Sequence, residues 1–128
     1  MAPVTWGTVM IRVVRIVAFA AAMCVSAGAF AAGAIAVDDE EGQHHEDVGY
    51  GVSVGAQSRD EAGGEAMRRC RSEGNTHCRV VVRFDKCGAY AVSSAHYGVG
   101  WGTSLRTAQN MALDKCGSNC RVAVSECE

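Results

Sequence analysis

The sequence predicts an α+β fold: a small disulfide-stapled domain in which about five strands form a sheet with two helices packed on it. A repeat carries this prediction. The phrase C-R-V-V-V at 78–82 returns as C-R-V-A-V at 120–124, and each follows a segment of helical pattern, 58–70 and 104–116, that runs from a serine to a cysteine. The chain therefore contains a duplicated strand–helix–strand unit. Its two expected copies are residues 50–87 and residues 97–127.

Both helices are expected to begin at a serine N-cap. Ser58 and Ser104 each precede an apolar stripe at helical spacing, and Glu61 completes a capping box in the first copy. Gly63 and Gly64 weaken the first helix by about 1 kcal/mol each relative to alanine, so the second helix should be sturdier. The residues expected on the apolar faces are Ala62, Ala66, Met67 and Cys70 in the first helix, and Leu105, Ala108, Met111, Ala112 and Cys116 in the second.

The strands follow from β-branched runs and from alternation. RVVVRF and RVAVS after the helices predict strands with a buried face, and GAYAVSS with HYGVGWG predicts a hairpin around residues 94–95. Gly98, Gly100 and Gly102 fall on one face of a strand, which permits close approach by a helix. We therefore expect one sheet with both helices on the same side and an approximate twofold relation between the units.

The N-terminal residues have the pattern of a secretory signal peptide. An arginine-containing start precedes an apolar, alanine-rich run, and the triplet Ala-Ile-Ala that ends at Ala36 fits a cleavage site. We therefore expect residues 1–36 to be removed, which leaves a secreted or cell-envelope protein with no membrane span. Cleavage after Ala29 and an uncleaved anchor over 16–37 stay open as alternatives.

Residues 37–47, VDDEEGQHHED, are expected to form an acidic, disordered leader, because they hold six acidic residues and few apolar ones. The disulfide-bonded α+β domain is then expected to span 48–128. This part carries eight acidic and ten basic residues, a mildly positive balance. The modest charge and the absence of a recognised motif exclude nucleic acid as the expected partner.

The cysteines predict three disulfides. Six of the seven lie after residue 36, and an even count in a small exported domain indicates pairing. In each unit one cysteine ends the helix and another opens the next strand, so these are expected to pair within the unit. The last two end equivalent strands and are expected to join one unit to the other. The predicted pairs are Cys70–Cys78, Cys116–Cys120 and Cys87–Cys127.

The order helix, Cys, Cys, RVVV and Cys-Gly-Ala, with a central YGVGWG and a repeated helix, resembles domain-of-unknown-function family 4189 over residues 48–127. The resemblance implies export, a cysteine-bonded α+β fold and an effector or cell-envelope role, and it supplies no catalytic residue. The first unit is expected to depart from the family pattern, with its opening hairpin, typically G-A-I-A-Y before the helix, shortened to one strand.

One motif invites a catalytic interpretation. GVSVG at 51–55 matches G-x-S-x-G, the nucleophile elbow, and Asp85 and His96 follow in hydrolase order. A small secreted hydrolase that uses Ser53 therefore stays open as an alternative. The repeat argues against it, because the matching segment has Gly100 where the serine stands. Packing explains the glycines in both copies, and no catalytic residue is predicted.

No cofactor and no metal are expected. The chain contains neither G-x-G-x-x-G nor G-x-x-x-x-G-K-S/T, so nothing indicates a nucleotide. Cys116 and Cys120 have zinc-compatible spacing, but thiols of an exported chain are expected to oxidise. His44 and His45 lie in the acidic leader and would hold a metal ion only loosely.

A cationic surface with two aromatic residues is the predicted binding site. Arginines near a helix end also favour the helix dipole and cover apolar surface, so this role is a hypothesis. The candidates are Arg68, Arg69, Arg71, Arg79, Arg83, Tyr97 and Trp101. We therefore expect a secreted binding or interaction protein whose partner is an unknown protein or an anionic envelope component. A structural role in the cell envelope is a further alternative.

Overall fold

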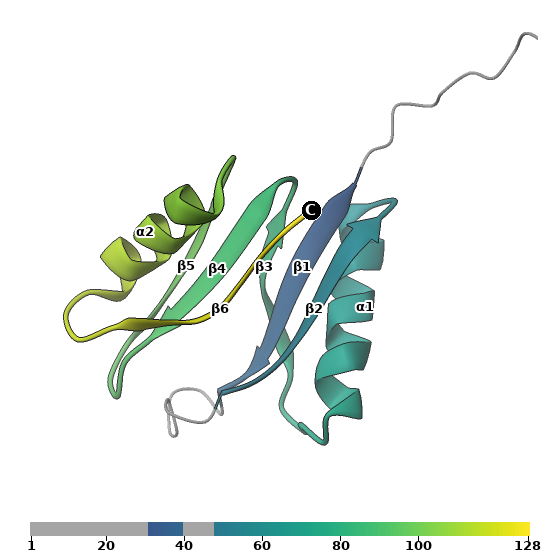
Figure 1. The fold of residues 1–128 in the computed structure, drawn as a ribbon. Coiled ribbons are helices and arrows are strands. Elements are labelled where there is room, and N and C mark those ends of the chain that lie inside the picture. The colour runs from purple at the N-terminus through teal and green to yellow at the C-terminus, as the bar shows by residue number, and fades with distance from the viewer. Residues whose placement is uncertain (1–30, 40–47) are drawn as a thin grey trace, which may run out of the picture.

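The computed structural model describes residues 31–39 and 48–128. In this part of the chain six strands form two three-stranded antiparallel sheets, with the orders β2-β1-β3 and β5-β4-β6, called here the first and second sheet. Figure 1 shows the two sheets face to face, with one helix outside each. The elements are β1 (Ala32–Asp38), β2 (Gly49–Ala56), α1 (Arg59–Ser72), β3 (Arg79–Phe84), β4 (Cys87–Val92), β5 (Tyr97–Gly102), α2 (Leu105–Cys116) and β6 (Arg121–Cys127).

The duplicated unit is one strand longer than the sequence predicts. β1 carries G-A-I-A-V at 33–37, which matches G-A-Y-A-V at 88–92 in β4, and each forms the central strand of its sheet. The units are therefore β1-β2-α1-β3 and β4-β5-α2-β6. The expected copies at 50–87 and 97–127 omit these first strands, and the expected shortening of the first hairpin is wrong.

The first strand also changes where the domain begins. β1 and Asp39 are almost wholly buried, so the domain starts before residue 48, and residues 37–39 are not part of a disordered leader. Cleavage after Ala36 would remove most of β1, whereas cleavage after Ala29 would leave it whole. The remainder of the expected leader, 40–47, and most of the expected signal peptide lie outside the described residues.

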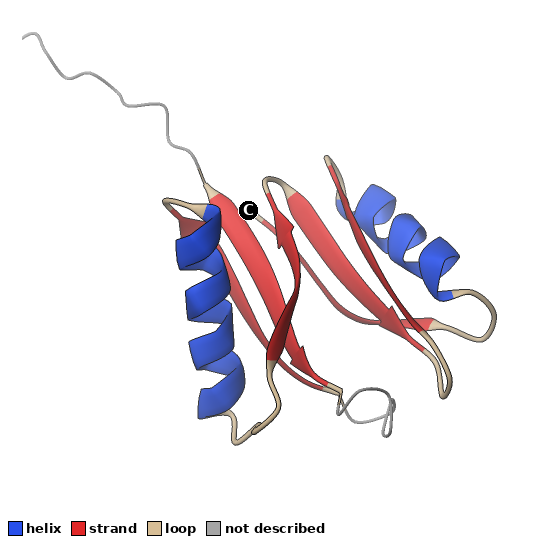
Figure 2. Ribbon diagram, turned by 180° about the vertical axis from the view of Figure 1, so that it is seen from behind, coloured by secondary structure: helices blue, strands red, loops and turns tan. Residues whose placement is uncertain are grey.

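Alternation along the central strands builds the layers. In β1, Ala34 and Ala36 pack against α1, while Ile35 and Val37 point into the space between the sheets. β4 repeats this division: its alanines pack on α2, and Tyr90 faces the first sheet. The result is a four-layer α/β/β/α arrangement, which corrects the expected single sheet with both helices on one side (Figure 2).

The helices lie close to the sheets because the facing residues are small. A Cβ on Gly100 of β5 would overlap the backbone of Ala108 and Ala112 in α2, and one on Gly51 of β2 would overlap the backbone of α1. The predicted glycine face is therefore a helix-packing face. Alanines on the helices complete it, and Ala66 and Ala112 are fully buried.

The helix starts confirm the sequence prediction. The Ser58 side chain accepts a hydrogen bond from the Glu61 N–H, and Ser104 accepts one from the Thr107 N–H. The Glu61 carboxylate accepts from the N–H of Gln57, one residue earlier than in the expected capping box. One expected face residue differs: Leu105 is 41 % exposed.

The three disulfides join the expected cysteines, Cys70–Cys78, Cys116–Cys120 and Cys87–Cys127. The third pair does not join the two units, which corrects the expectation. Cys87 opens β4 and lies directly opposite Cys127 of β6, so the bond crosses two neighbouring strands of the second sheet. The corresponding positions of the first unit hold Ala32 and Asp85.

We predict that Gly100→Ala lowers the free energy of unfolding by about 1–3 kcal/mol, because the new methyl group forces α2 away from β5. Gly64→Ala is the control. It places the same methyl group on the exposed side of α1 and should raise stability by up to about 1 kcal/mol. Chemical denaturation of the oxidised proteins measures both, and equal effects would contradict the close-packing account.

We predict that a truncated chain starting at residue 30 folds, whereas one starting at residue 37 does not, because the second lacks most of the central strand of the first sheet. Near-ultraviolet circular dichroism after oxidative refolding distinguishes the two outcomes. A folded chain lacking residues 32–36 would show that β1 is dispensable.

Candidate functional site

Ser53 lies inside the contact between β2 and α1. Its side chain is 1 % exposed, and Oγ donates a 2.6 Å hydrogen bond to the carbonyl oxygen of Ala62. The other members of the hydrolase pattern lie elsewhere: Asp85 bonds to Arg59 at 3.0 Å, and His96 belongs to the turn between β4 and β5. The geometry gives Ser53 a role in holding the helix on the strand, where no substrate reaches it.

A buried carboxylate joins the two sheets at the end of β1. Asp39 accepts a 2.6 Å hydrogen bond from the hydroxyl of Tyr90 in the second sheet and pairs with Arg79 of β3 at 2.7 Å. The Arg79 guanidinium lies 4.9 Å from the ring centre of Tyr97, and the Tyr97 ring stacks on Tyr90. These four residues, the Asp39 cluster, account for two of the predicted binding residues, Arg79 and Tyr97.

Burial shifts the acid–base behaviour of this cluster. Removal of Tyr90 from water, reinforced by its hydrogen bond to Asp39, raises the pKa of the phenol well above its ordinary value of 10. The hydrogen bond to Asp39 raises the pKa of Arg79, although partial burial acts in the opposite direction. Arg79 therefore stays charged and Tyr90 stays a neutral phenol across the neutral pH range.

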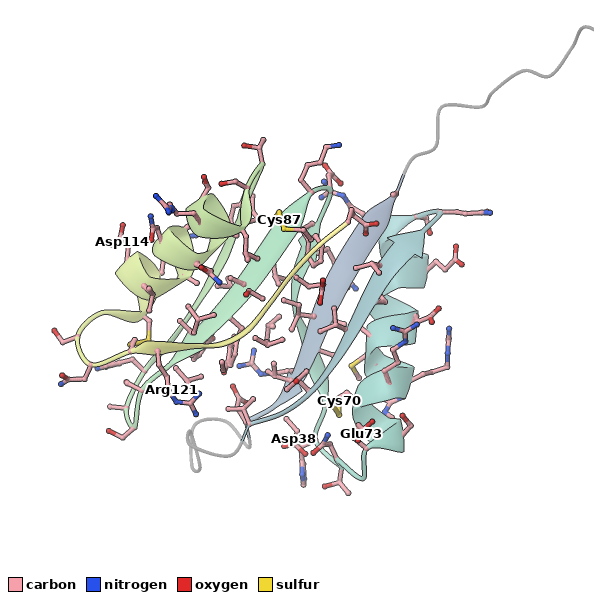
Figure 3. All side chains as sticks on the ribbon, in the orientation of Figure 1. Asp38, Cys70, Glu73, Cys87, Asp114 and Arg121 are labelled. Carbon is pink, nitrogen blue, oxygen red and sulfur yellow. A yellow bond between two sulfur atoms is a disulfide. The ribbon has the colours of Figure 1, made fainter. Side chains whose placement is uncertain are left out.

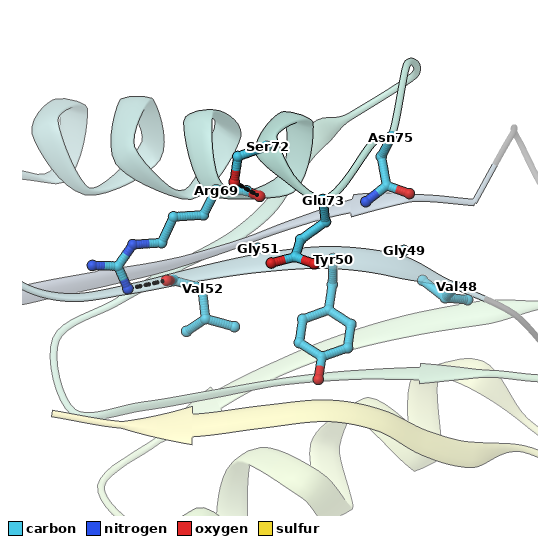
Figure 4. Close-up of a pocket in the computed structure, with 9 residues that line it drawn as sticks. All are labelled: Val48, Gly49, Tyr50, Gly51, Val52, Arg69, Ser72, Glu73 and Asn75. Carbon is cyan, nitrogen blue, oxygen red and sulfur yellow. Dashed lines mark hydrogen bonds between the residues drawn. The ribbon is translucent and has the colours of Figure 1, made fainter.

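Arg69 lines a shallow groove of about 530 Å³ beside β2 (Figure 4). Its guanidinium donates a 2.8 Å hydrogen bond to the carbonyl of Val52 and pairs with Glu65 at 2.8 Å. Arg68 pairs with the same glutamate, at 3.6 Å, on the outer side of α1. Arg71 is exposed near the end of that helix. Of these three predicted binding residues, only Arg69 lines this groove, which it shares with Tyr50, while Arg68 and Arg71 lie outside it.

A larger cleft, of about 740 Å³, opens between the edge strands β3 and β5. These strands lie behind β1 and β4 in Figure 1 and come to the front in Figure 2. Three cations, Arg59, Arg83 and Lys86, line it against one carboxylate, Asp85, and Trp101 lines the opposite wall. The cleft is therefore positively charged with an aromatic wall.

Neighbouring groups hold the cleft residues in place. Arg83 donates through Nε to the carbonyl of Arg59, at 3.2 Å, and its guanidinium covers Gly63 of α1. Trp101 is 47 % exposed and carries Lys115 of α2 over its ring, with Nζ 4.4 Å from the ring centre. Arg83 and Trp101 are thus positioned by the fold, and both side chains are exposed.

The family model for the domain of unknown function DUF4189 matches residues 32–127, which includes β1 and both complete units. The chain belongs to the DUF4189 family. No curated protein and no solved structure matches it. Membership of this family agrees with the observed start of the domain, since the match begins at the first residue of β1.

The structure brings together only some of the residues predicted for this DUF4189 domain. Arg83 and Trp101 share the β3/β5 cleft, whereas Arg79 and Tyr97 belong to the Asp39 cluster. The sequence prediction missed Arg59 and Lys86, which are separated from Trp101 along the chain. It also missed Asp39 and Tyr90. Matching GAIAV with GAYAV would have identified β1, which Asp39 follows, and β4, which carries Tyr90.

The described residues offer no group of three or more histidine, cysteine, aspartate or glutamate side chains that could hold a metal ion. His44 and His45 lie outside the described part of the chain. Within the ranges 31–39 and 48–128, no helix is long and apolar enough to cross a membrane. The three disulfides suggest an oxidising compartment outside the cytoplasm.

We predict that Tyr90→Phe lowers the free energy of unfolding by about 1–3 kcal/mol at neutral pH, because the buried Asp39 carboxylate loses a donor. In the unaltered domain, stability should fall as the pH rises above 10. The unfolded tyrosine ionises there while the folded one stays protonated, which favours the unfolded state. Denaturation of the oxidised domain across this range should show a weaker decline for Tyr90→Phe, and identical profiles would contradict the assignment.

Proposed function

We propose that this DUF4189 domain is a secreted binding protein that recognises an anionic partner through the β3/β5 cleft. One observation carries the proposal: a half-exposed tryptophan faces three basic side chains across an open cleft. Tryptophan and arginine are the residues most enriched at binding hot spots. Their presence in one cleft supports recognition of an acidic surface.

The electrostatics of the cleft favour an anion. Asp85 is engaged by Arg59 in a bidentate contact, at 3.0 and 3.1 Å. Arg83 and Lys86 are therefore left without a carboxylate partner among the described residues. Exposed cations of this kind increase the rate at which an oppositely charged partner associates, and their effect weakens with salt.

The chemistry of the cleft supports binding rather than hydrolysis. Its lining consists mainly of cations, valine and aromatic side chains, and Ser53 lies buried beneath α1, outside this lining. A nucleophile needs a base within hydrogen-bond reach, and the hydroxyl of Ser53 is instead donated to a helix carbonyl. Secretion is supported by the signal-like N-terminus together with the disulfides.

The proposal predicts that poly-L-glutamate binds the oxidised domain and that Arg83→Ala with Lys86→Ala weakens binding at least tenfold at low salt. The matched control is Arg68→Ala with Arg71→Ala, which removes the same charge from α1 outside the cleft and should change binding less than twofold. Fluorescence of Trp101 and isothermal titration calorimetry measure the affinity.

Thermal unfolding of each variant verifies that the fold is retained. An equal loss of affinity in both double variants would show that binding depends on the net charge of the domain, and this would contradict the cleft assignment. Failure of the unaltered domain to bind poly-L-glutamate at low salt would contradict the proposed recognition of anionic polymers.

A further inference from the structure

The duplicated units differ at their outer hairpin strands, β2 and β5. Both are edge strands, and an edge exposes backbone N–H and C=O groups that can pair with another strand. Neighbouring side chains engage the β2 backbone. Arg69 donates to the carbonyl of Val52, and the Glu128 carboxylate accepts a 2.7 Å hydrogen bond from the N–H of Gly55. The register of β2 on β1 is also interrupted near this end.

The β5 edge has none of these protections among the described residues. Its pairing with β4 is regular from Tyr97 to Gly102, and the strand holds no charge and no proline. Lys115, which corresponds to Arg69, lies over Trp101 instead of reaching the strand backbone. No hydrogen bond of the described residues joins a side chain to the backbone of Val99. An open, regular edge of this kind is suited to accept a further strand.

The repeat shows which backbone groups of β5 point outward. Val52 pairs with Ile35 as Val99 pairs with Tyr90, so the two valines are equivalent. The Val52 carbonyl points away from β1, since it bonds to Arg69. The Val99 carbonyl and N–H therefore point away from β4. Because orientation alternates along a strand, the backbone groups of Tyr97 and Trp101 point outward as well.

An added strand would lie beside the cleft. In antiparallel pairing, a residue opposite Val99 has its side chain on the same face as Val99 and Trp101. Trp101 lines the cleft, so every second side chain of the added strand would face Arg83 and Lys86. Carboxylates at these positions would meet unpaired cations.

The positive charge of the cleft also favours an acidic peptide over a second copy of this chain as the strand that pairs with β5. A second copy that paired through its own β5 would bring two clefts of the same sign to one edge, which disfavours the contact. We propose that β5 binds an extended acidic peptide of a partner protein, which adds antiparallel to it as a fourth strand of the second sheet. This inference rests on the proposed function and specifies how the anion is held.

Backbone methylation tests the strand pairing. The probe is an end-capped peptide of eight residues in which glutamate and valine alternate. In antiparallel pairing, the residues whose carboxylates face the cleft are those whose N–H groups point at β5. N-methylation of the glutamate amides should weaken binding at least tenfold, whereas N-methylation of the valine amides should change it less than threefold. Both methylated peptides keep the same charge and the same number of methyl groups.

A protein variant gives the reciprocal test. Val99→Pro removes an outward N–H from β5 and leaves the ladder to β4, so the domain should fold but bind the peptide at least tenfold more weakly. Val52→Pro makes the same change at the equivalent position of β2 and should leave peptide binding unaltered. Circular dichroism of both variants verifies the fold.

The outcomes separate the strand geometry from the proposed function. If both methylated peptides bind as the parent does, and Arg83 and Lys86 are still required, strand addition is wrong and anion recognition stands. If methylation of the valine amides alone weakens binding, antiparallel addition is wrong. If the acidic peptide does not bind, both proposals fail. A dimer in analytical ultracentrifugation that Val99→Pro dissociates would show that a second copy occupies the edge.

Discussion

The fold depends on burial of the large apolar side chains on the face of each sheet that points away from its helix. Small residues fill the contact between helix and sheet, so each helix packs closely on one face of its sheet. The helix does not cover the opposite face. The second face carries Ile35 and Val37 in one unit and Tyr90 and Val92 in the other, and these pack together. Figure 3 shows side chains filling the space between the two sheets. Phe84 completes the contact, because its ring lies against Gly33 and Gly88, which occupy equivalent places on the two central strands. The large apolar side chains of each unit are therefore buried by the other unit.

Duplication also separates the positions that serve the fold from those that differ between the copies. The alanines of the central strands, the serine caps and the cysteine pair after each helix recur, and all of them stabilise the unit. The differences gather near the second hairpin. Trp101 and Lys115 stand where the first unit has Val54 and Arg69, so the second unit exposes a tryptophan in place of a valine, and its lysine lies over that ring instead of bonding to the strand backbone. The Cys87–Cys127 bond occurs only there and fixes the start of β4 against β6.

Local signals could be predicted from the sequence, and contacts between distant segments could not. The caps at Ser58 and Ser104 and the short disulfides follow from spacing within one unit, so the predictions agree with the structure. β1 was predicted wrongly because a strand that packs on a helix through alanine has the composition of a signal peptide. The number of sheets was also wrong, since alternation shows that a strand has two buried faces but not what covers each. The cleft joins Arg59 of α1 to Trp101 of β5, and no periodicity relates these positions.

The ends of β5 are held before any partner arrives. At its start, Tyr97 stacks on Tyr90 and lies beside Arg79, and both of these residues are bonded to the buried carboxylate of Asp39. At its other end, Lys115 covers one side of the Trp101 ring. Binding is weakened by the entropy lost when mobile groups become ordered, so an edge fixed at both ends loses less on association. The Asp39 cluster therefore stabilises the contact between the sheets and, through Tyr97, also orders the strand to which we assign recognition.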